Sequence, residues 1–213
     1  MRLPSDIWIS SAAEFDRRGK PCLFLDRDGV VVKEIHYLSR VQDVALEHGA
    51  VDLIQAARAI DLSVVVVTNQ AGIAKGLFDL EQYVAVEAEI ERLLKAQGAK
   101  VDLTIACPYH PDFTPNYSTQ MEQWRKPGPA MLEFAGHHMG IRLERSWIVG
   151  DRASDIEAGR NAKINGAFHV ETGHGRVERE KAASLETKNY PVIFCRTPAD
   201  TATRLRDLFT NFS

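Results

Sequence analysis

Short apolar runs recur along the chain and have the length and composition of buried strands. They lack polar alternation and are rich in β-branched residues where they are longest, a pattern typical of parallel strands covered on both faces. They span residues 22–25, 64–67, 101–106, 147–149, 167–170 and 192–195. The pattern predicts a mainly parallel β-sheet.

Segments with helical periodicity lie between these runs. They span residues 49–60, 79–97, 129–139, 154–162 and 197–209. Asp79 and Gln82 form a capping-box pattern at the start of the second segment, and Gly98 suits its end. Because strands alternate with helices, we predict an α/β fold, a three-layer doubly wound domain with a mainly parallel sheet.

Two long irregular stretches, 31–47 and 108–127, interrupt this alternation. Long loops within a compact domain are often functional. We expect residues 1–19 to form an N-terminal extension and residues 20–213 to form a single domain. The segment between Val30 and Leu62 is short and already includes a helix, so we expect no large cap domain.

The composition is that of an ordinary soluble globular protein, with 45% hydrophobic and 26% charged residues. The net charge of -3 and the scattered basic residues argue against a nucleic-acid partner. No apolar run reaches the about 18 residues of a membrane span, so we expect no membrane partner. Three widely spaced cysteines, Cys22, Cys107 and Cys195, predict free thiols and a cytoplasmic location.

The first polar cluster is a pair of carboxylates at the end of the first apolar run. Asp26 and Asp28 follow residues 22–25 directly, and Gly29 lets the backbone turn sharply. Two acids this close repel each other unless a cation or a shared proton intervenes. Taken alone, the pair is compatible with a metal site, an acid/base pair or a solvated turn.

Three further polar clusters begin near the ends of later segments. Thr68 follows the strongest apolar run, Lys126 precedes a helix, and Asp151 follows the run at 147–149. Each cluster alone could be a surface turn, a surface basic pair or a helix cap. Asp155, four residues after Asp151, is one candidate for that cap.

Together the four clusters indicate phosphoryl transfer, because a doubly wound sheet brings such strand ends into one crevice. Oxygen ligands from Asp26 and Asp151, with waters and a phosphate, suit Mg²⁺. One carboxylate then attacks phosphorus, while the metal and Lys126 offset the developing charge. Asp28 protonates the leaving alcohol and afterwards deprotonates the attacking water.

These residues resemble, in order, the four motifs of the haloacid dehalogenase (HAD) phosphatase superfamily. Asp26-x-Asp28-Gly29 matches the first motif, Thr68 the second, Lys126 the third and Gly150-Asp151-x-x-x-Asp155 the fourth. The resemblance implies that Asp26 is the nucleophile, Asp28 the general acid/base, and Thr68 and Lys126 the groups that hold the phosphoryl group. It also implies one Mg²⁺ held by the side chains of Asp26 and Asp151 and by the backbone carbonyl of Asp28.

A closer likeness joins the chain to the D-glycero-D-manno-heptose 1,7-bisphosphate phosphatase and histidinol-phosphatase family. It rests on the segments 24–29, 68–76, 107–111 and 125–127. The resemblance implies a sugar (bis)phosphate substrate, a monomer and a place in carbohydrate metabolism. The substrate-binding residues that it implies are Glu34, His36, Tyr37, Asn69, Gln70, Arg125 and Arg152.

The loop that carries a structural zinc in many members of this family departs from their pattern. Cys107 is present, but Tyr109 stands where a histidine is common, and residues 121–124 contain no cysteine. A closed zinc site normally takes four nitrogen or sulfur ligands. We therefore predict that structural zinc is absent and that Tyr109, Tyr117 and Trp124 order the loop.

Other functions are compatible with parts of this pattern. Histidinol-phosphate phosphatases belong to the same family, and polynucleotide 3′-phosphatases carry similar Thr-Asn-Gln and Arg-Lys-Pro segments, although they need a basic track. A receiver-like phospho-accepting domain and a catalytically dead binding domain are the alternatives that are not enzymes. Asp26 and Asp28 at one strand end favour a hydrolase over both.

Overall fold

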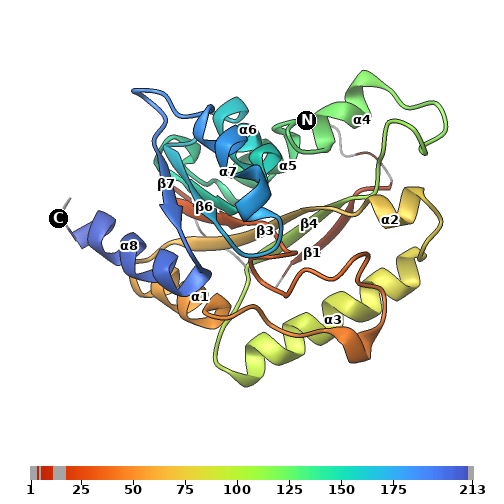
Figure 1. Cartoon of the computed structure of the whole chain (residues 1–213), viewed down its shortest axis with the longest axis horizontal. Helices are drawn as coiled ribbons and strands as arrows, with labels where there is room; N and C mark the ends of the chain where they lie inside the picture. Colours follow the sequence, from red (N-terminus) through yellow and green to blue (C-terminus); the bar gives the residue numbers. More distant parts are fainter. Residues whose placement is uncertain (1–3, 5, 12–17, 211–213) are drawn as a thin grey trace.

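The computed structural model describes residues 4, 6–11 and 18–210. Within them, one seven-stranded sheet has the order β1-β4-β3-β2-β5-β6-β7, and only β1 runs antiparallel to its neighbour (Figure 1). The strands are β1 (Trp8–Ser11), β2 (Cys22–Leu25), β3 (Ser63–Asn69), β4 (Leu103–Cys107), β5 (Trp147–Gly150), β6 (Gly166–Val170) and β7 (Val192–Cys195).

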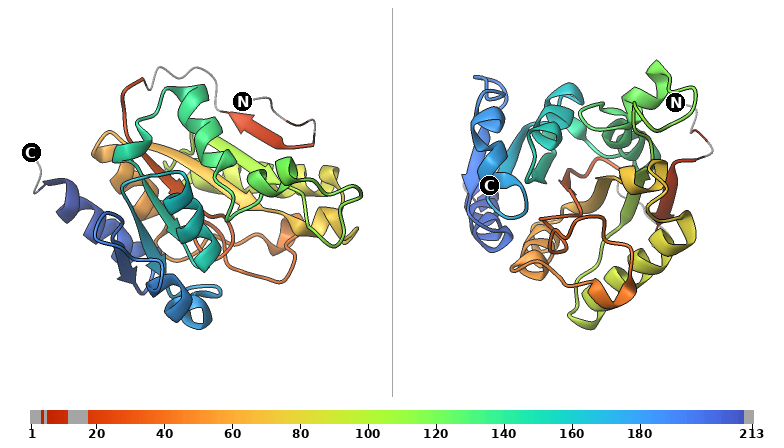
Figure 2. Two further views of the ribbon diagram at one scale, coloured as in Figure 1. Left: turned by 90° about the horizontal axis from the view of Figure 1, so that it is seen from above. Right: turned by 45° about the vertical axis from the view of Figure 1, so that its right-hand side comes forward.

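Helices cover both faces of the sheet and complete the three layers. One face carries α5, α6 and α7, and the other carries α1, α3 and α8, as two further directions of view confirm (Figure 2). The α-helices are α1 (Ala50–Ala59), α2 (Ala71–Ala74), α3 (Leu80–Ala96), α4 (Thr119–Trp124), α5 (Ala130–Met139), α6 (Ala153–Asn161), α7 (Gly175–Ala183) and α8 (Pro198–Thr210). Two 3₁₀ turns are η1 (Val41–Asp43) and η2 (Leu143–Arg145).

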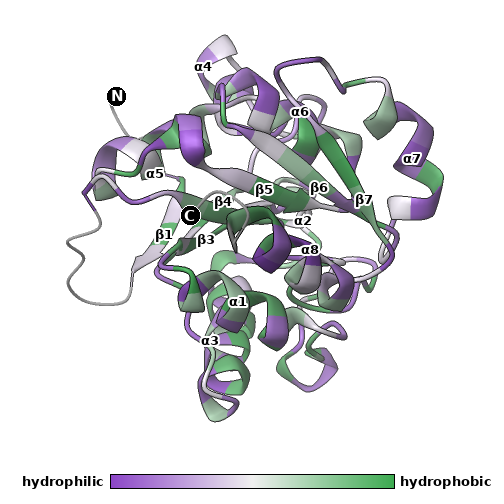
Figure 3. Cartoon of the chain, turned by 90° about the vertical axis from the view of Figure 1, so that its left-hand side faces the viewer, coloured by the Kyte–Doolittle hydropathy of each residue, from purple (hydrophilic) through white to green (hydrophobic). Residues whose placement is uncertain are grey.

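Two hydrophobic cores lie on opposite faces of the sheet, because successive strand side chains point to opposite sides. Phe24 packs in the core beneath α5 and α6, whereas Leu23 and Leu25 pack in the core beneath α1 and α8. The central strands are predominantly hydrophobic, while α7 and the connecting loops carry many hydrophilic residues (Figure 3). Burial on both faces explains why these strands read as continuous apolar runs.

The predicted α/β fold is confirmed, and the predicted elements agree with the structure except at their ends. Strands β2 and β7 have the predicted bounds, and the others differ by one or two residues. The capping box of Asp79 and Gln82 is formed at the start of α3. All three cysteines are buried free thiols, and no helix in the described chain combines the length and apolar character of a bilayer span.

The sequence prediction contained no counterpart for β1, α2, α4 or α7. Strand β1 is short and pairs Trp8 with Ala106, far along the chain, so no local pattern announces it. Helix α2 is a single turn, and α4 lies within the stretch expected to be irregular. Helix α7 is mostly polar, and its Val177 is 88% exposed, so it lacks an apolar stripe. Residues 1–3, 5 and 12–17 of the predicted N-terminal extension lie outside the described residues.

Candidate active site

Strand β2 occupies the position in the sheet where a doubly wound fold binds its ligands. It lies between β3 and β5, and Asp26 leaves its carboxyl end with the backbone N–H donating to the carbonyl of Val149 at 2.9 Å. Gly29 has φ +81°, and a Cβ at this position would lie 2.8 Å from the Asp151 carboxylate. The chain therefore turns through a conformation, and a space, that favour glycine.

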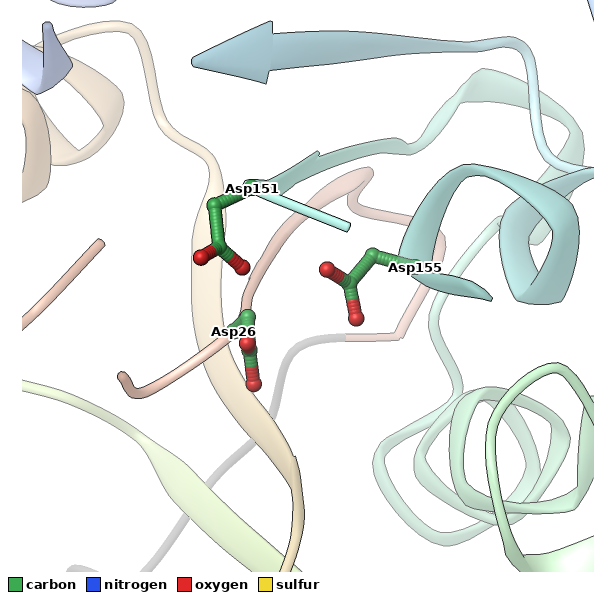
Figure 4. Close-up of side chains that lie close together, drawn as sticks. All are labelled: Asp26, Asp151 and Asp155. Carbon is green, nitrogen blue, oxygen red and sulfur yellow. The ribbon is translucent and has the colours of Figure 1, made fainter. Parts of the chain in front are cut away.

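Three buried carboxylates converge beyond the ends of β2 and β5 (Figure 4). Asp26, Asp151 and Asp155 each offer an oxygen, and these oxygens lie within 4.8 Å of one another. Asp26 and Asp151 follow their strands directly, and Asp155 comes from the first turn of α6. The topology of the sheet thus gathers three negative charges at one point.

Lys126 supplies the positive charge closest to this cluster. Its Nζ lies 2.7 Å from Asp26 Oδ1 and 2.7 Å from Asp155 Oδ1. It also donates a hydrogen bond of 2.8 Å to the carbonyl oxygen of Val67. Because the lysine side chain is buried, these contacts hold its ammonium group in one place.

The side chain of Asn69 fixes the backbone that carries this lysine. Its Nδ2 donates to the Lys126 carbonyl at 3.0 Å, and its Oδ1 accepts from the Lys126 N–H at 3.0 Å. These paired bonds join the end of β3 to the segment before α5. Asn69, predicted as a substrate contact, positions the lysine in this structure.

Gln70 joins the second and first motifs. Its Nε2 donates to Thr68 Oγ1 at 2.8 Å and to Asp28 Oδ2 at 3.0 Å. Both Gln70 and Thr68 are buried, whereas Asp28 is partly exposed to the cavity. The carboxylate of Asp28 accepts hydrogen bonds from Gln70 and Arg27 and is not one of the three carboxylates of the cluster.

Burial and mutual repulsion shape the electrostatics of the cluster. Burial raises the pKa of Asp26 to about 7, with further repulsion from Asp155 and Asp28 that Lys126 partly offsets. Burial, with repulsion from Asp26 and Asp155, raises the pKa of Asp151 to about 9. Although burial opposes its charge, the pKa of Lys126 is raised because Asp155 and Asp26 stabilise the ammonium.

This arrangement fits a divalent cation with oxygen ligands. Asp151 Oδ1 is buried and accepts no hydrogen bond within the described residues. Its other oxygen accepts from the His174 backbone N–H at 2.7 Å. A cation beside Asp26, Asp151 and Asp155 would satisfy the free oxygen and relieve the repulsion that raises their pKa values.

All the residues predicted for catalysis and substrate binding line one cavity of about 320 Å³. They are Asp26, Asp28, Glu34, His36, Tyr37, Thr68, Asn69, Gln70, Arg125, Lys126 and Arg152. Asp151, predicted as a metal ligand, is fully buried within the carboxylate cluster. The structure therefore brings the predicted site together, and the individual roles remain predictions.

Three residues of the site had no predicted role. Asp155, which the sequence placed in the fourth motif without a role of its own, joins the carboxylate cluster. Lys75 lines the cavity, donates to the Tyr37 hydroxyl at 2.7 Å and lies over the Phe113 ring at 5.1 Å. His110 also lines the cavity, and the sequence marked it only as part of the segment 107–111 that carries the family likeness.

The loop between β4 and α4 is held by protein contacts. Tyr109 and Trp124 are buried, and Tyr117 packs against the same core. Arg125 Nη1 donates to the Tyr109 carbonyl at 3.0 Å, which connects the loop to the lysine motif. Burial raises the pKa of the Cys107 thiol to about 12. The three aromatic residues predicted to order the loop thus have the expected packing.

The fold, the order of the motifs and the carboxylate cluster define a HAD-like hydrolase. The HAD-hydrolase-like family model matches residues 123–193, which contain Lys126, Asp151 and Asp155. A D-glycero-beta-D-manno-heptose-1,7-bisphosphate 7-phosphatase of Mesorhizobium japonicum is 39% identical over 144 residues, which are 68% of this chain and 66% of that protein. A D-glycero-alpha-D-manno-heptose-1,7-bisphosphate 7-phosphatase of Photorhabdus laumondii is 35% identical over 170 residues, 79% of this chain and 92% of that protein.

A solved structure agrees with these relatives. The D,D-heptose 1,7-bisphosphate phosphatase from B. bronchiseptica, complexed with magnesium and phosphate, has a TM-score of 0.76 at 28% identity and covers 88% of this chain and 99% of its own. The chain therefore belongs to the HAD-like phosphatases, in the family that contains the heptose 1,7-bisphosphate 7-phosphatases. The family resemblance noted from the sequence is confirmed.

Proposed function

We propose that this phosphatase removes the 7-phosphate of D-glycero-D-manno-heptose 1,7-bisphosphate through an aspartyl-phosphate formed on Asp26. The observation that carries the mechanism is the 2.7 Å contact between Lys126 Nζ and Asp26 Oδ1 beside the carboxylate cluster. This contact supports the proposal, because it holds a positive charge beside the carboxylate that would attack phosphorus. Such preorganised charge is a large source of rate enhancement.

The side chains of Asp26 and Asp151 would hold Mg²⁺, and Asp155 lies within the same group of carboxylates. The family resemblance adds the backbone carbonyl of Asp28 as a further ligand. When bound, the ion neutralises the carboxylates and the phosphoryl oxygens. The structural comparison supports this choice, because the B. bronchiseptica enzyme is complexed with magnesium and phosphate.

The remaining chemistry uses side chains of this chain. Asp26 attacks phosphorus and the bond to the leaving oxygen breaks, while Asp28 gives its proton to that oxygen. Asp28 then takes a proton from the water that attacks the aspartyl-phosphate, which returns free Asp26 and inorganic phosphate. Lys126 and the hydroxyl of Thr68 hold the phosphoryl oxygens through both steps.

The cavity offers charges that suit a second phosphate on the same substrate. Besides Lys126, the cavity is lined by three basic residues, Lys75, Arg125 and Arg152. Burial, with repulsion from Arg152, lowers the pKa of Arg125, so a bound anion would stabilise its charge. Glu34 lines the same cavity and can accept hydrogen bonds from sugar hydroxyls.

The names of the relatives support the heptose substrate. Both the alpha and the beta anomer of heptose 1,7-bisphosphate appear among them, at 35% and 39% identity. We propose that the chain acts on this substrate class as a monomer in the cytoplasm. The buried free thiols support the cytoplasmic setting. Sedimentation of the purified protein tests the monomer.

The first experiment is a substrate panel with Mg²⁺ or with chelator. It contains both anomers of heptose 1,7-bisphosphate, histidinol phosphate and a 3′-phosphorylated oligonucleotide. We expect Mg²⁺-dependent release of the 7-phosphate with the highest kcat/KM on a heptose bisphosphate. A higher kcat/KM on histidinol phosphate or on the oligonucleotide would contradict the substrate proposal.

The nucleophile is tested with Asp26→Asn, which keeps the shape of the side chain but removes its nucleophilic charge. We expect a loss of activity of about 10³-fold or more, because removal of a covalent nucleophile typically costs this much. Full Mg²⁺-dependent activity in this variant would rule out the aspartyl-phosphate mechanism.

A further inference from the structure

Arg27, between the two aspartates of the first motif, is a cation in an unusual place. Its side chain is only 2% exposed, and burying a guanidinium is costly unless it is paired and hydrogen-bonded. The phosphatase mechanism assigns it no role. Its contacts connect Asp28 and Gln70 of the site with Glu87 of α3.

The Arg27 guanidinium donates two hydrogen bonds to the Asp28 carboxylate. Nε donates to Asp28 Oδ2 at 3.2 Å and Nη2 donates to Asp28 Oδ1 at 3.0 Å. Nη2 also donates to Gln70 Oε1 at 3.1 Å, and Gln70 in turn donates to Asp28 Oδ2. A planar fork and an amide therefore hold both oxygens of this carboxylate.

Glu87 holds the guanidinium from the opposite side. Arg27 Nη1 donates to Glu87 Oε1 at 2.9 Å, and Glu87 is 9% exposed in the middle of α3. The Arg27 guanidinium also lies 5.4 Å from the ring centroid of Tyr83, one turn earlier on the same helix. Helix α3 therefore fixes the position of the Arg27 guanidinium, and the guanidinium in turn fixes the position of the Asp28 carboxylate.

We propose that Glu87 and Arg27 are positioning residues for proton transfer by Asp28, with Glu87 acting through Arg27. The proposal rests on the phosphatase mechanism above and adds to it a route from α3 to the general acid. Proton transfer to a leaving oxygen depends on the placement of the acid. A residue that fixes this placement affects the step without touching the substrate.

The leaving group provides a selective test of this role. An alkyl phosphate such as glycerol 1-phosphate needs a proton on its departing oxygen, whereas 2,4-dinitrophenolate departs as a stable anion without one. The kcat/KM reports the steps through formation of the aspartyl-phosphate. Displacement of the Asp28 carboxylate therefore lowers kcat/KM for the alkyl ester and leaves kcat/KM for the dinitrophenyl ester unchanged. A general structural defect lowers kcat/KM for both esters.

The variant to test is Glu87→Gln, which keeps the side-chain shape and removes the charge that holds Arg27. We expect kcat/KM for glycerol 1-phosphate to fall about 100-fold, the typical worth of positioned acid catalysis. For 2,4-dinitrophenyl phosphate it should stay within about threefold of the wild type. Equal losses on both esters, or none on either, would overturn the proposal.

Two further variants frame this result. Glu91→Gln changes another glutamate of α3 that lines the same cavity of about 420 Å³ as Glu87 and Arg27, and both esters should then behave as in the wild type. Glu87→Asp keeps the negative charge but shortens the side chain by one methylene. The fall in kcat/KM for glycerol 1-phosphate should therefore be smaller than in Glu87→Gln. A selective loss in Glu91→Gln as large as in Glu87→Gln would contradict the specific role of Glu87.

A crystal structure of the wild-type protein with Mg²⁺ and vanadate tests the same idea without any variant. We expect Asp28 to remain within hydrogen-bond distance of Arg27 Nη2, and Arg27 to remain paired with Glu87. Rotation of the Asp28 carboxylate away from Arg27 would overturn the proposal. Neither ester is a heptose, so failure on heptose bisphosphate would revise the substrate and leave these outcomes interpretable.

Discussion

At the scale of single residues, two glycines make room for the carboxylate of Asp151. A Cβ on Gly173 would lie 2.2 Å from Asp151 Oδ2, and one on Gly29 would lie 2.8 Å from it. Both glycines have positive φ, at +54° and +81°. The backbone thus approaches this carboxylate more closely than any side chain would allow.

Gly173→Ala should therefore damage the metal site beyond its effect on the backbone. We expect a loss of stability of about 1–2 kcal/mol from the left-handed conformation, together with weaker Mg²⁺ binding as the Asp151 carboxylate is displaced. Thermal unfolding and Mg²⁺ titration of activity measure the two effects separately.

Gly19→Ala is the matched control, because Gly19 has φ +76° with no atom within 4 Å of the added Cβ. It should show the loss of stability and unchanged Mg²⁺ dependence. Equal Mg²⁺ dependence in both alanine variants would contradict a role for Gly173 in shaping the metal site.

At the scale of elements, the segment from β4 to α4 shows how a loop is ordered by packing. Trp124 and Tyr109 are buried against the core, and His110 N–H donates to Thr114 Oγ1 at 2.8 Å. The His110 Nδ1 accepts from the Asp112 N–H at 3.2 Å. These contacts link the segment to the core and connect its own turns.

We predict that this loop keeps its structure without zinc. The purified protein should contain well below one zinc per chain, and dipicolinate should leave its unfolding temperature unchanged, because the loop lacks a set of four nitrogen and sulfur ligands. Elemental analysis and thermal unfolding provide the two measurements. Stoichiometric zinc, or destabilisation by the chelator, would show that the loop depends on a metal after all.

At the scale of the whole molecule, the carboxylate cluster couples the stability of the fold to pH. In the folded state the pKa of Asp26 is about 7 and that of Asp151 about 9, both above the ordinary 3.8 of aspartate. The folded protein therefore keeps protons that the unfolded chain releases, and stability falls as pH rises between about 4 and about 9. A bound cation replaces these protons and removes the penalty.

We expect the unfolding temperature of the metal-free protein to fall by several degrees between pH 6 and pH 9. Mg²⁺ should raise it more at the upper end of this range than at the lower end. Calorimetry with chelator and with Mg²⁺ measures both, and Asp151→Asn should flatten the metal-free profile. A metal-free unfolding temperature that rises toward pH 9 would show that other groups dominate the linkage.

Much of the fold and of the site was predictable because the relevant information is local. Buried parallel strands read as apolar runs, and the polar residues at their carboxyl ends share one edge of the sheet. Asp26, Thr68 and Asp151 were predicted to meet for this reason, and they do. Asp28 and Lys126 could be added because each stands in a recognisable turn before or after an element.

Other features depend on contacts between segments far apart in sequence. Three contacts are of this kind: the antiparallel pairing of β1 with β4, the hydrogen bonds of the Asn69 side chain to the Lys126 backbone, and the ion pair of Arg27 with Glu87. Local periodicity gives a residue its element and its face, but not the polar atom that it meets across the fold. Motif order and strand pattern thus specify a phosphatase site in an α/β sheet, whereas the orientation of Asp28 depends on a helix whose contact with the first motif exists only in the folded chain.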